Sequence, residues 1–163
     1  MEQKVIEALR WIIGILDARK IPYQLSGGFA ARLYGSPREL HDIDIDVPEK
    51  HFPDILPEIS EYITFGPARF QDGKWDCELI TLNYHGQDID LSGAETMRMS
   101  DKARTRILDW PADLSAALKM NVENLEVQVI HPRNLARYKK KLDGDHQQID
   151  ILAAENYISV HKL

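Results

Sequence analysis

Ser26-Gly27-Gly28, followed closely by Asp42-Ile43-Asp44-Ile45-Asp46-Val47, is the part of the chain that decides its fold. The second stretch alternates acidic and apolar side chains, and this period of two predicts a half-buried strand with one face in the core. On such a strand Asp42, Asp44 and Asp46 share one face, and neighbouring acids have Cα atoms roughly 6.6 Å apart. Two ionised carboxylates ~5 Å apart repel by about 3 kcal/mol at an effective dielectric of ~20. A divalent metal ion is the simplest compensation for this repulsion.

Two other interpretations of the acidic row stay open. The row could be the wet face of an edge strand, where charge discourages aggregation, although Lys is the usual residue there and Asp is depleted in strands. The row could also be a calcium-binding loop, although the EF-hand pattern needs a Gly at its sixth position and polar residues between the acids. Ile43 and Ile45 argue against this second alternative.

The glycine pair lies between a short predicted strand, residues 23–25, and a predicted helix, residues 29–34. A strand, glycine turn and helix in this order are typical of phosphate binding, because glycine lets backbone N–H groups approach an anion and a helix N-terminus favours negative charge. Taken alone, Gly27-Gly28 would be read as an ordinary tight turn. The acidic strand that follows is what favours phosphate binding.

The rest of the N-terminal two thirds reads as two helical segments and a meander of strands. Apolar residues at helical spacing predict a helix over 2–19, and 49–60 looks helical but interrupted at its prolines. Strands are predicted over 63–70, 74–84 and 87–91. In the last of these, Asp88 and Asp90 share a face, so the meander could bring a third carboxylate to the first two, unless these acids simply end the strand.

The C-terminal third is predicted to be mainly helical. We expect a short helix over 112–120, a strand over 127–130, a helix over 135–142, and a last helix with Asp145 as its N-cap. Residues 94–111 show no clear pattern, and their basic side chains are typical of a solvated face.

The composition indicates an ordinary globular protein. Its 163 residues suit one domain, 44% of them are hydrophobic and 28% are charged. The net charge of -6 disfavours a general nucleic-acid binder and is compatible with a cationic small substrate.

The single cysteine, Cys77, excludes an internal disulfide, which fits a reducing cytosol. It lies in a strand-like run and is expected to be a small buried hydrophobe rather than a nucleophile. The first seven residues lack the layout of a signal peptide, and no apolar run approaches the ~20 residues that span a bilayer. We therefore expect a cytoplasmic protein with no membrane partner.

The spaced motifs resemble those of the nucleotidyltransferase superfamily with the DNA polymerase β-like fold. The likeness is greatest to the small nucleotidyltransferases that modify lincosamides and some aminoglycosides. The motifs that carry it are Gly27-Gly28, the Arg38-x-x-x-Asp42-Ile43-Asp44 strand, the later strand Asp88-Ile89-Asp90-Leu91, His131-Pro132 with Leu135, Tyr138 and Lys139, and Asp145-His146 with Asp150. One extra residue between His146 and Asp150 departs from the family pattern, so no role is assigned to His146.

This resemblance implies an α/β (α+β) fold, with a mixed, partly antiparallel sheet on which helices pack. It implies a single nucleotidyltransferase domain over 1–163, of which 132–163 is a C-terminal helical part. The family's spacing from the glycines favours Asp42 and Asp44 as the metal pair over Asp44 and Asp46. It also favours Asp90 over Asp88 as the third acid.

The implied activity is the transfer of a nucleoside monophosphate, expected to be AMP from ATP, to a hydroxyl of a small molecule such as an antibiotic. Two Mg²⁺ ions would be held by Asp42, Asp44 and Asp90, which are the catalytic residues in this interpretation. Asp90 could also accept the hydroxyl proton. The triphosphate would be bound by the following residues: Ser26, Gly27, Gly28, Arg38 and Lys139.

Two other functions are weighed against this one. A toxin-like nucleotidyltransferase acting on tRNA or protein would be expected to show a basic surface or an added domain, and neither the charge nor the length encourages it. A degenerate module that binds nucleotide without turnover is disfavoured by the intact set of Asp42, Asp44 and Asp90. A homodimer is a reasonable expectation, because one small domain would leave part of its sheet thinly covered.

Overall fold

The computed structural model describes residues 1–163 and contains five α-helices and nine strands. The helices are α1 (Gln3–Ala18), α2 (Gly27–Leu33), α3 (Phe52–Ile59), α4 (Pro132–Lys139) and α5 (Asp145–His161). The strands are β1 (Gln24–Ser26), β2 (Ile43–Val47), β3 (Ile63–Gln71), β4 (Trp75–Tyr84), β5 (Gln87–Gly93), β6 (Arg98–Ser100), β7 (Ile107–Asp109), β8 (Leu118–Val122) and β9 (Leu125–Val129). Three short 3-10 helices complete the chain: η1 (Glu49–His51), η2 (Ser60–Tyr62) and η3 (Leu114–Ala116).

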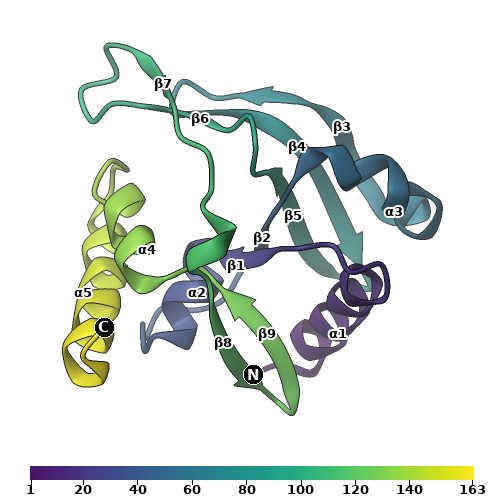
Figure 1. Ribbon diagram of the computed structural model, residues 1–163, viewed down its shortest axis with the longest axis horizontal. Coiled ribbons are helices and arrows are strands. Elements are labelled where there is room, and N and C mark those ends of the chain that lie inside the picture. The colour runs from purple at the N-terminus through teal and green to yellow at the C-terminus, as the bar shows by residue number, and fades with distance from the viewer.

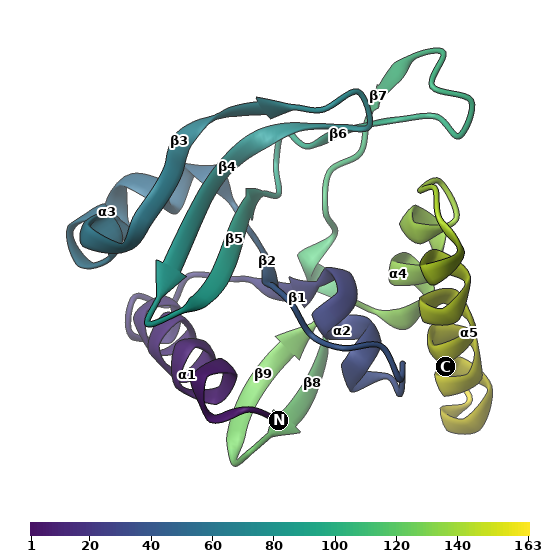
Figure 2. The ribbon, with the colours of Figure 1, turned by 180° about the vertical axis from the view of Figure 1, so that it is seen from behind.

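All nine strands belong to one mixed sheet. Its order is β7-β6-β4-β5-β2-β1-β9-β8, and β3 pairs with β4 beside this path. The pairs β2–β5 and β1–β9 are parallel, and the other pairs are antiparallel. In both ribbon views α4 and α5 lie together on one side of the molecule, and α1 and α3 lie on the other (Figures 1 and 2). The predicted α+β fold is confirmed.

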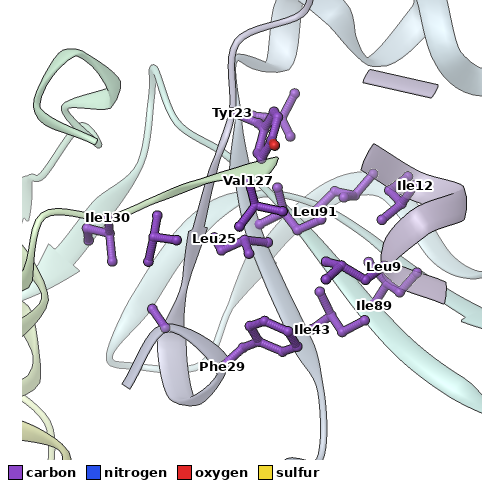
Figure 3. Close-up of a cluster of buried hydrophobic side chains, with 14 of the residues drawn as sticks. Leu9, Ile12, Tyr23, Leu25, Phe29, Ile43, Ile89, Leu91, Val127 and Ile130 are labelled. Carbon is purple, nitrogen blue, oxygen red and sulfur yellow. The ribbon is translucent and has the colours of Figure 1, made fainter. Parts of the chain in front are cut away.

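One face of the central strands forms the core. Leu25, Ile45, Leu91 and Ile80 are register neighbours across β1, β2, β5 and β4, and none of them is exposed. Side chains of α1, among them Leu9 and Ile12, lie close to this face, and so does the ring of Phe29 from α2 (Figure 3). The alternation read in the acidic strand therefore reflects a real two-sided sheet, and its apolar residues are in the core as predicted.

The prediction of a helix over 112–120 is wrong. Only the single turn η3 forms there, and the chain then enters β8, which pairs with β9. Leu118, Met120 and Val122 alternate with polar residues, which is the strand period rather than the helix period. The hairpin turns at Glu123 and Asn124, which both have positive φ. The turn has no Gly, and it is Gly that most strongly marks a hairpin in a sequence.

Two further details differ from the prediction: the effect of the prolines on α3 and the residue that caps α5. The prolines of 49–60 do not break α3, because Pro53 lies in its first turn, where its missing N–H is not needed, and the helix continues through Pro57. The N-cap of α5 is Gly144 rather than Asp145, which instead lies in the first turn. A carboxylate at that place still favours the helix through its dipole.

The hairpin of β6 and β7 reaches toward the turn between α4 and α5. Arg104 Nη2, in the loop of this hairpin, lies 2.9 Å from the Asp143 carboxylate, and Lys102 Nζ donates to the Leu142 carbonyl at 3.2 Å. The sheet and the C-terminal helices are thereby joined across a cleft. None of the helices is long and apolar enough to cross a lipid bilayer.

Candidate active site

The second face of the central strands is polar where it faces the cleft. Ser26 on β1 is the register partner of Asp44 on β2, Asp44 is the partner of Asp90 on β5, and Asp90 is the partner of Thr81 on β4. Neighbouring strands lie roughly 4.8 Å apart, so Asp44 and Asp90 project side by side from the same face. The structure therefore brings these two predicted acids together, with Ser26 beside them.

Burial and repulsion from neighbouring acids both raise the pKa values of Asp44 and Asp90. The pKa of Asp44 is raised to about 7, first by burial and then by the charges of Asp90, Asp42 and Asp46, with Lys139 acting in the opposite direction. Such repulsion between carboxylates favours a cation among them.

A third acid, Asp42, stands at the exposed end of the strand that carries Asp44. Asp42 lies just before β2 and its surface is exposed. Partial desolvation by the surrounding protein, and then the charge of Asp88, raise its pKa. The pKa of Asp90 is also raised, mainly by burial, and the charges of Asp42 and Asp88 add to this rise. Asp42 is thus near Asp90 but outside the cleft lining. No group of three acidic, His or Cys side chains is arranged so that it could hold a metal ion as the side chains stand.

Asp46, which follows Asp44 on the same face, is held by protein donors. Its carboxylate accepts a hydrogen bond from Gln24 Nε2 at 2.9 Å and one from Ser26 Oγ at 3.3 Å. Burial raises the pKa of Asp46 to about 6, and these two hydrogen bonds oppose the rise. Because its oxygens are engaged in this way, Asp46 is suited to shaping the floor of the cleft.

The cleft beside these acids has a volume of about 760 Å³. Ser26, Gly27 and Gly28 line it together with Asp44 and Asp90, and Lys139 from α4 faces them. Much of its remaining wall comes from the hairpin strands and the segment after them, through Phe70, Trp75, Leu79, Met97 and Trp110. Asn134 and Arg137 of α4 also line it, and the sequence did not indicate these two residues. The strand period contained a signal for part of this wall, because alternate residues of β4 must share the face of Thr81, the partner of Asp90.

Gly27 is required by its neighbours. It has a φ of +61°, and a Cβ built on it would lie 2.0 Å from Asp44 Oδ2. Its N–H donates a hydrogen bond of 2.7 Å to the hydroxyl of buried Tyr138 on α4. A Cβ at Gly28 would meet no atom within 4 Å. The two glycines therefore differ sharply in how much they tolerate a side chain.

Gly27→Ala is expected to destabilise the protein by about 1–2 kcal/mol from the left-handed backbone alone, and by more if Asp44 cannot move aside. Gly28→Ala is the matched control, and it should be neutral or stabilising by up to about 1 kcal/mol because Ala favours a helix over Gly. Urea denaturation of both variants compares these values. Equal stability of the two variants would contradict the described packing of Asp44 against Gly27.

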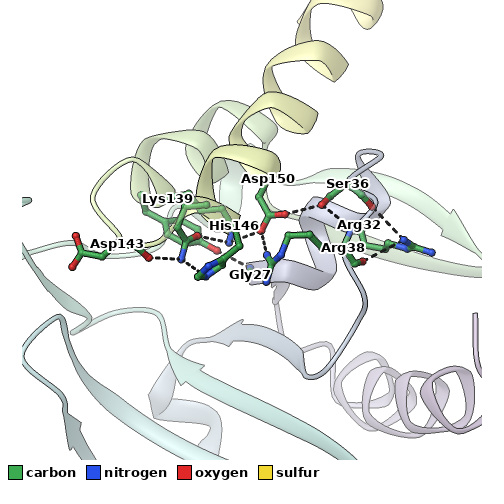
Figure 4. A network of polar contacts seen from close by, with 10 residues as sticks. Gly27, Arg32, Ser36, Arg38, Lys139, Asp143, His146 and Asp150 are labelled. Atoms are coloured by element: carbon green, nitrogen blue, oxygen red, sulfur yellow. Dashed lines mark hydrogen bonds and ion pairs between the residues drawn. The ribbon is translucent and has the colours of Figure 1, made fainter.

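Asp150 forms the centre of a buried polar network that joins three segments (Figure 4). Its carboxylate has no exposed surface and accepts from Ser36 Oγ at 2.7 Å and Arg38 Nη1 at 2.5 Å, while Lys139 Nζ lies 3.0 Å away. The predicted phosphate-binding cations Arg38 and Lys139 are therefore brought together through Asp150. Lys139 lines the cleft, whereas Arg38 does not.

His146 lies at the exposed edge of this network (Figure 4). Its ring nitrogen Nε2 lies 3.0 Å from Gln147 Nε2, and Gln147 Oε1 accepts a hydrogen bond from Lys139 Nζ at 3.1 Å. Cys77 is buried in the cleft wall, and burial raises the pKa of its thiol to about 11. A thiol that holds its proton in this way is a poor nucleophile, as the sequence predicts.

Solved structures of nucleotidyltransferases share this fold over nearly the whole chain. A protein from Thermotoga maritima, provisionally described as a nucleotidyltransferase, matches with a TM-score of 0.71 and 21% identity over 99% of this chain and 93% of its own. The enzyme ANT(2'')-Ia in complex with adenylyl-2''-tobramycin matches with a TM-score of 0.65 and 14% identity, over 98% of this chain and 92% of its own. The lincosamide adenylyltransferase LnuA with bound lincomycin matches with a TM-score of 0.62 and 13% identity, over 93% and 96%. At these identities the likeness shows the fold: the chain has the architecture of a nucleotidyltransferase.

The family itself is shown by the sequence. The model of the aminoglycoside-2''-adenylyltransferase family matches residues 8–152, and the chain therefore belongs to that family of nucleotidyltransferases. A search of curated proteins gave no significant match.

Proposed function

We propose that this protein transfers AMP from ATP to a hydroxyl group of a small molecule in a Mg²⁺-dependent reaction. The observation that carries the proposal is the in-register pair of Asp44 and Asp90, which opens into a cleft beside the Gly27 turn. The chain's family supports the reaction class.

The donor chemistry of the acidic strands fits magnesium. Mg²⁺ binds carboxylate, phosphate and water oxygens. Burial and then repulsion from neighbouring acids raise the pKa of Asp44, and this repulsion marks a place where positive charge is favourable. Asp44 and Asp90 would hold the metal, and Asp42 would join them by turning inward from the strand end. When bound, two Mg²⁺ ions would stabilise charge on the attacking and leaving oxygens of an in-line displacement.

The rest of the site would bind and orient the triphosphate. Lys139 faces the acids across the cleft and would neutralise phosphate charge, with Arg38 acting from behind it through the shared partner Asp150. Gly28 lies in the first turn of α2, where backbone N–H groups have no partner within the helix. A Cβ at Gly28 would meet no atom within 4 Å, so a phosphate could approach its backbone without steric hindrance. The N–H of Gly27 already donates to Tyr138, so phosphate contact there would require the Tyr138 hydroxyl to move aside.

Asp90 is the residue that we propose as the proton acceptor. It lies beside Asp44 in the sheet and lines the cleft, so an acceptor hydroxyl in the cleft could reach its carboxylate. Its position would let it take the proton of the acceptor hydroxyl as that oxygen attacks the α-phosphate.

The size of the cleft supports a small acceptor. A volume of about 760 Å³ lies within the range of small-molecule sites, which is about 300–1,000 Å³. The net charge of -6 gives no support to a nucleic-acid acceptor. In this proposal residues 1–163 act as one domain, with α4 supplying the nucleotide side of the cleft and α5 holding Lys139 through Asp150.

A nucleotide-binding module without turnover is the second candidate. It is favoured by one observation, which is that Asp42 stands outside the cleft and no three-residue metal site is formed. The two candidates differ in whether pyrophosphate is released.

The test is pyrophosphate release from each common nucleoside triphosphate, with lincomycin, tobramycin and bulk tRNA as acceptors and Asp42→Asn beside the wild type. We expect release from ATP with a small-molecule acceptor, and we expect EDTA or Asp42→Asn to abolish it. Metal-dependent ATP binding without release would favour the binding module. ATP binding that is equal in the wild type and in Asp42→Asn and does not depend on metal would contradict the assignment of these acids to a metal site.

A further inference from the structure

Tyr138 is the one tyrosine that lines the cleft. It lies on α4 directly before Lys139, and only 9% of the residue is exposed. Its hydroxyl oxygen accepts the hydrogen bond of 2.7 Å that the N–H of Gly27 donates. The side chain thus reaches from α4 to the glycine turn and joins the two parts of the site that are proposed to bind phosphate.

The hydroxyl group of Tyr138 has a proton that no protein atom accepts. A phenol keeps its proton at neutral pH, so it can donate one hydrogen bond while its oxygen accepts another. The oxygen is paired with Gly27, whereas the hydroxyl donates no hydrogen bond within the protein. Asp46, on the floor of the same cleft, is already engaged by Gln24 and Ser26. A buried donor that has no acceptor favours a ligand that supplies one.

The ring of Tyr138 is held by its neighbours. It packs edge-on against Trp75 of β4, with the ring centres 5.6 Å apart and the planes at 70°. Lys139 Nζ lies 5.8 Å from the centre of the tyrosine ring and 3.0 Å from the carboxylate of Asp150. Moving the hydroxyl away from Gly27 would disturb these contacts. The packing therefore favours a hydroxyl that keeps its place when a ligand enters.

The position of this hydroxyl suits a phosphate group. Gly27 packs directly on Asp44, because a Cβ on Gly27 would lie 2.0 Å from Asp44 Oδ2. The hydroxyl that Gly27 holds therefore stands near a proposed metal ligand, and the cation Lys139 is the next residue of the same helix. A phosphate oxygen at this place would accept a charge-assisted hydrogen bond, which is stronger than one between neutral groups. The N–H of Gly27 adds to its strength, because donation to the phenol oxygen polarises the O–H bond.

We propose that Tyr138 is a phosphate-binding residue of the triphosphate site, whose hydroxyl donates a hydrogen bond to a phosphate oxygen while its own oxygen keeps the N–H of Gly27. Gly27 thereby acts on the nucleotide through Tyr138, without direct contact. This inference rests on the proposed nucleotidyl transfer, and it adds a neutral donor to the site beside the cation Lys139.

Calorimetric titration with Mg²⁺ and a non-hydrolysable ATP analogue tests this role. Tyr138→Phe keeps the ring and removes the hydroxyl. We expect the analogue to bind this variant about tenfold to a hundredfold more weakly than the wild type, which corresponds to the loss of a hydrogen bond to a charged group. Unchanged affinity would overturn the inference. Tighter binding would also overturn it, because the hydroxyl would then be an obstacle at the phosphate site rather than a donor.

Tyr23→Phe is the matched control. The hydroxyl of Tyr23 accepts a hydrogen bond of 3.2 Å from the backbone N–H of Gln128, and this residue is 4% exposed and lies outside the cleft. Each variant leaves one backbone N–H without its phenol oxygen, so both should lower the free energy of unfolding in similar measure. Only Tyr138→Phe should weaken binding of the analogue. An equal loss of affinity in the two variants would overturn the inference.

The phosphorus NMR spectrum of the bound analogue separates a direct contact from an effect on the fold. At saturation we expect Tyr138→Phe to shift the resonance of the phosphate that accepts the hydrogen bond, and Tyr23→Phe to leave all resonances in place. Resonances that are the same in the wild type and in Tyr138→Phe would overturn this inference alone. Failure of the wild type to bind the analogue with Mg²⁺ would overturn the proposed function as well.

Discussion

Asp44→Asn is expected to lower the catalytic efficiency of nucleotidyl transfer by about 10³-fold, which corresponds to roughly 4 kcal/mol of transition-state stabilisation. The reason is its position between Ser26 and Asp90 in the sheet, at the centre of the acidic group that we propose binds the metal. An amide at this position has no negative charge to offer a cation. The measurement is kcat/KM at saturating Mg²⁺, with the acceptor found in the panel above.

The same variant should remain folded, which separates loss of function from loss of structure. In EDTA its free energy of unfolding is expected to equal or exceed that of the wild type, because burial and neighbouring acids disfavour the charge of Asp44. Asp54→Asn is the control, since it makes the same change at an exposed acid of α3 outside the cleft. Activity of Asp44→Asn at the level of this control would contradict the assignment of Asp44 to the metal site.

Asp150→Ala is expected to destabilise the protein by about 3–5 kcal/mol, because it leaves a buried cation without its partner. The side chain of Lys139 is only 6% exposed and that of Arg38 is 28% exposed, so water would not replace the carboxylate fully at Lys139. Ser36 would lose its acceptor as well. The contacts that α4 and α5 make with the loop after α2 should be lost first.

Glu155→Ala on the same helix is the matched control for this loss. Glu155 pairs with Lys140 at 2.9 Å, but both side chains are about half exposed, so the change should cost no more than about 1 kcal/mol. Urea denaturation of the two variants gives the comparison. A cost for Asp150→Ala as small as that for Glu155→Ala would show that the network of Figure 4 contributes little to stability.

The central strands could be predicted because their pattern is local. The alternation over 42–47 became β2, with its isoleucines in the core and its acids on the other face. The expected meander became β3, β4 and β5, with Asp90 beside Asp44 in the parallel pair. The helix over 2–19 appeared as α1, since apolar residues at helical spacing leave few alternatives.

The rest depended on contacts between residues far apart in the chain. The hydrogen bond from Gly27 to Tyr138 joins segments more than a hundred residues apart, and so does the pairing of Asp150 with Arg38. The pairing of Asp150 with Lys139 joins two separate helices, and no local pattern encodes any of these contacts. The particular residues of the apolar wall could not be named from the sequence, because the face of β3 and β4 that turns to the cleft depends on the pairing of β4 with β5. The extent of β8 was missed because its hairpin turn lacks Gly.

The fate of the phosphates of ATP distinguishes nucleotidyl transfer from other reactions of the nucleotide. The protein is incubated with Mg²⁺, an acceptor pool and ATP that is labelled at either the α- or the γ-phosphate, and the acceptor is then separated and counted. We expect the α-label to move to the acceptor and the γ-label to leave in pyrophosphate. Transfer of the γ-label to the acceptor, or intact ATP with every acceptor although the nucleotide binds with Mg²⁺, would contradict nucleotidyl transfer.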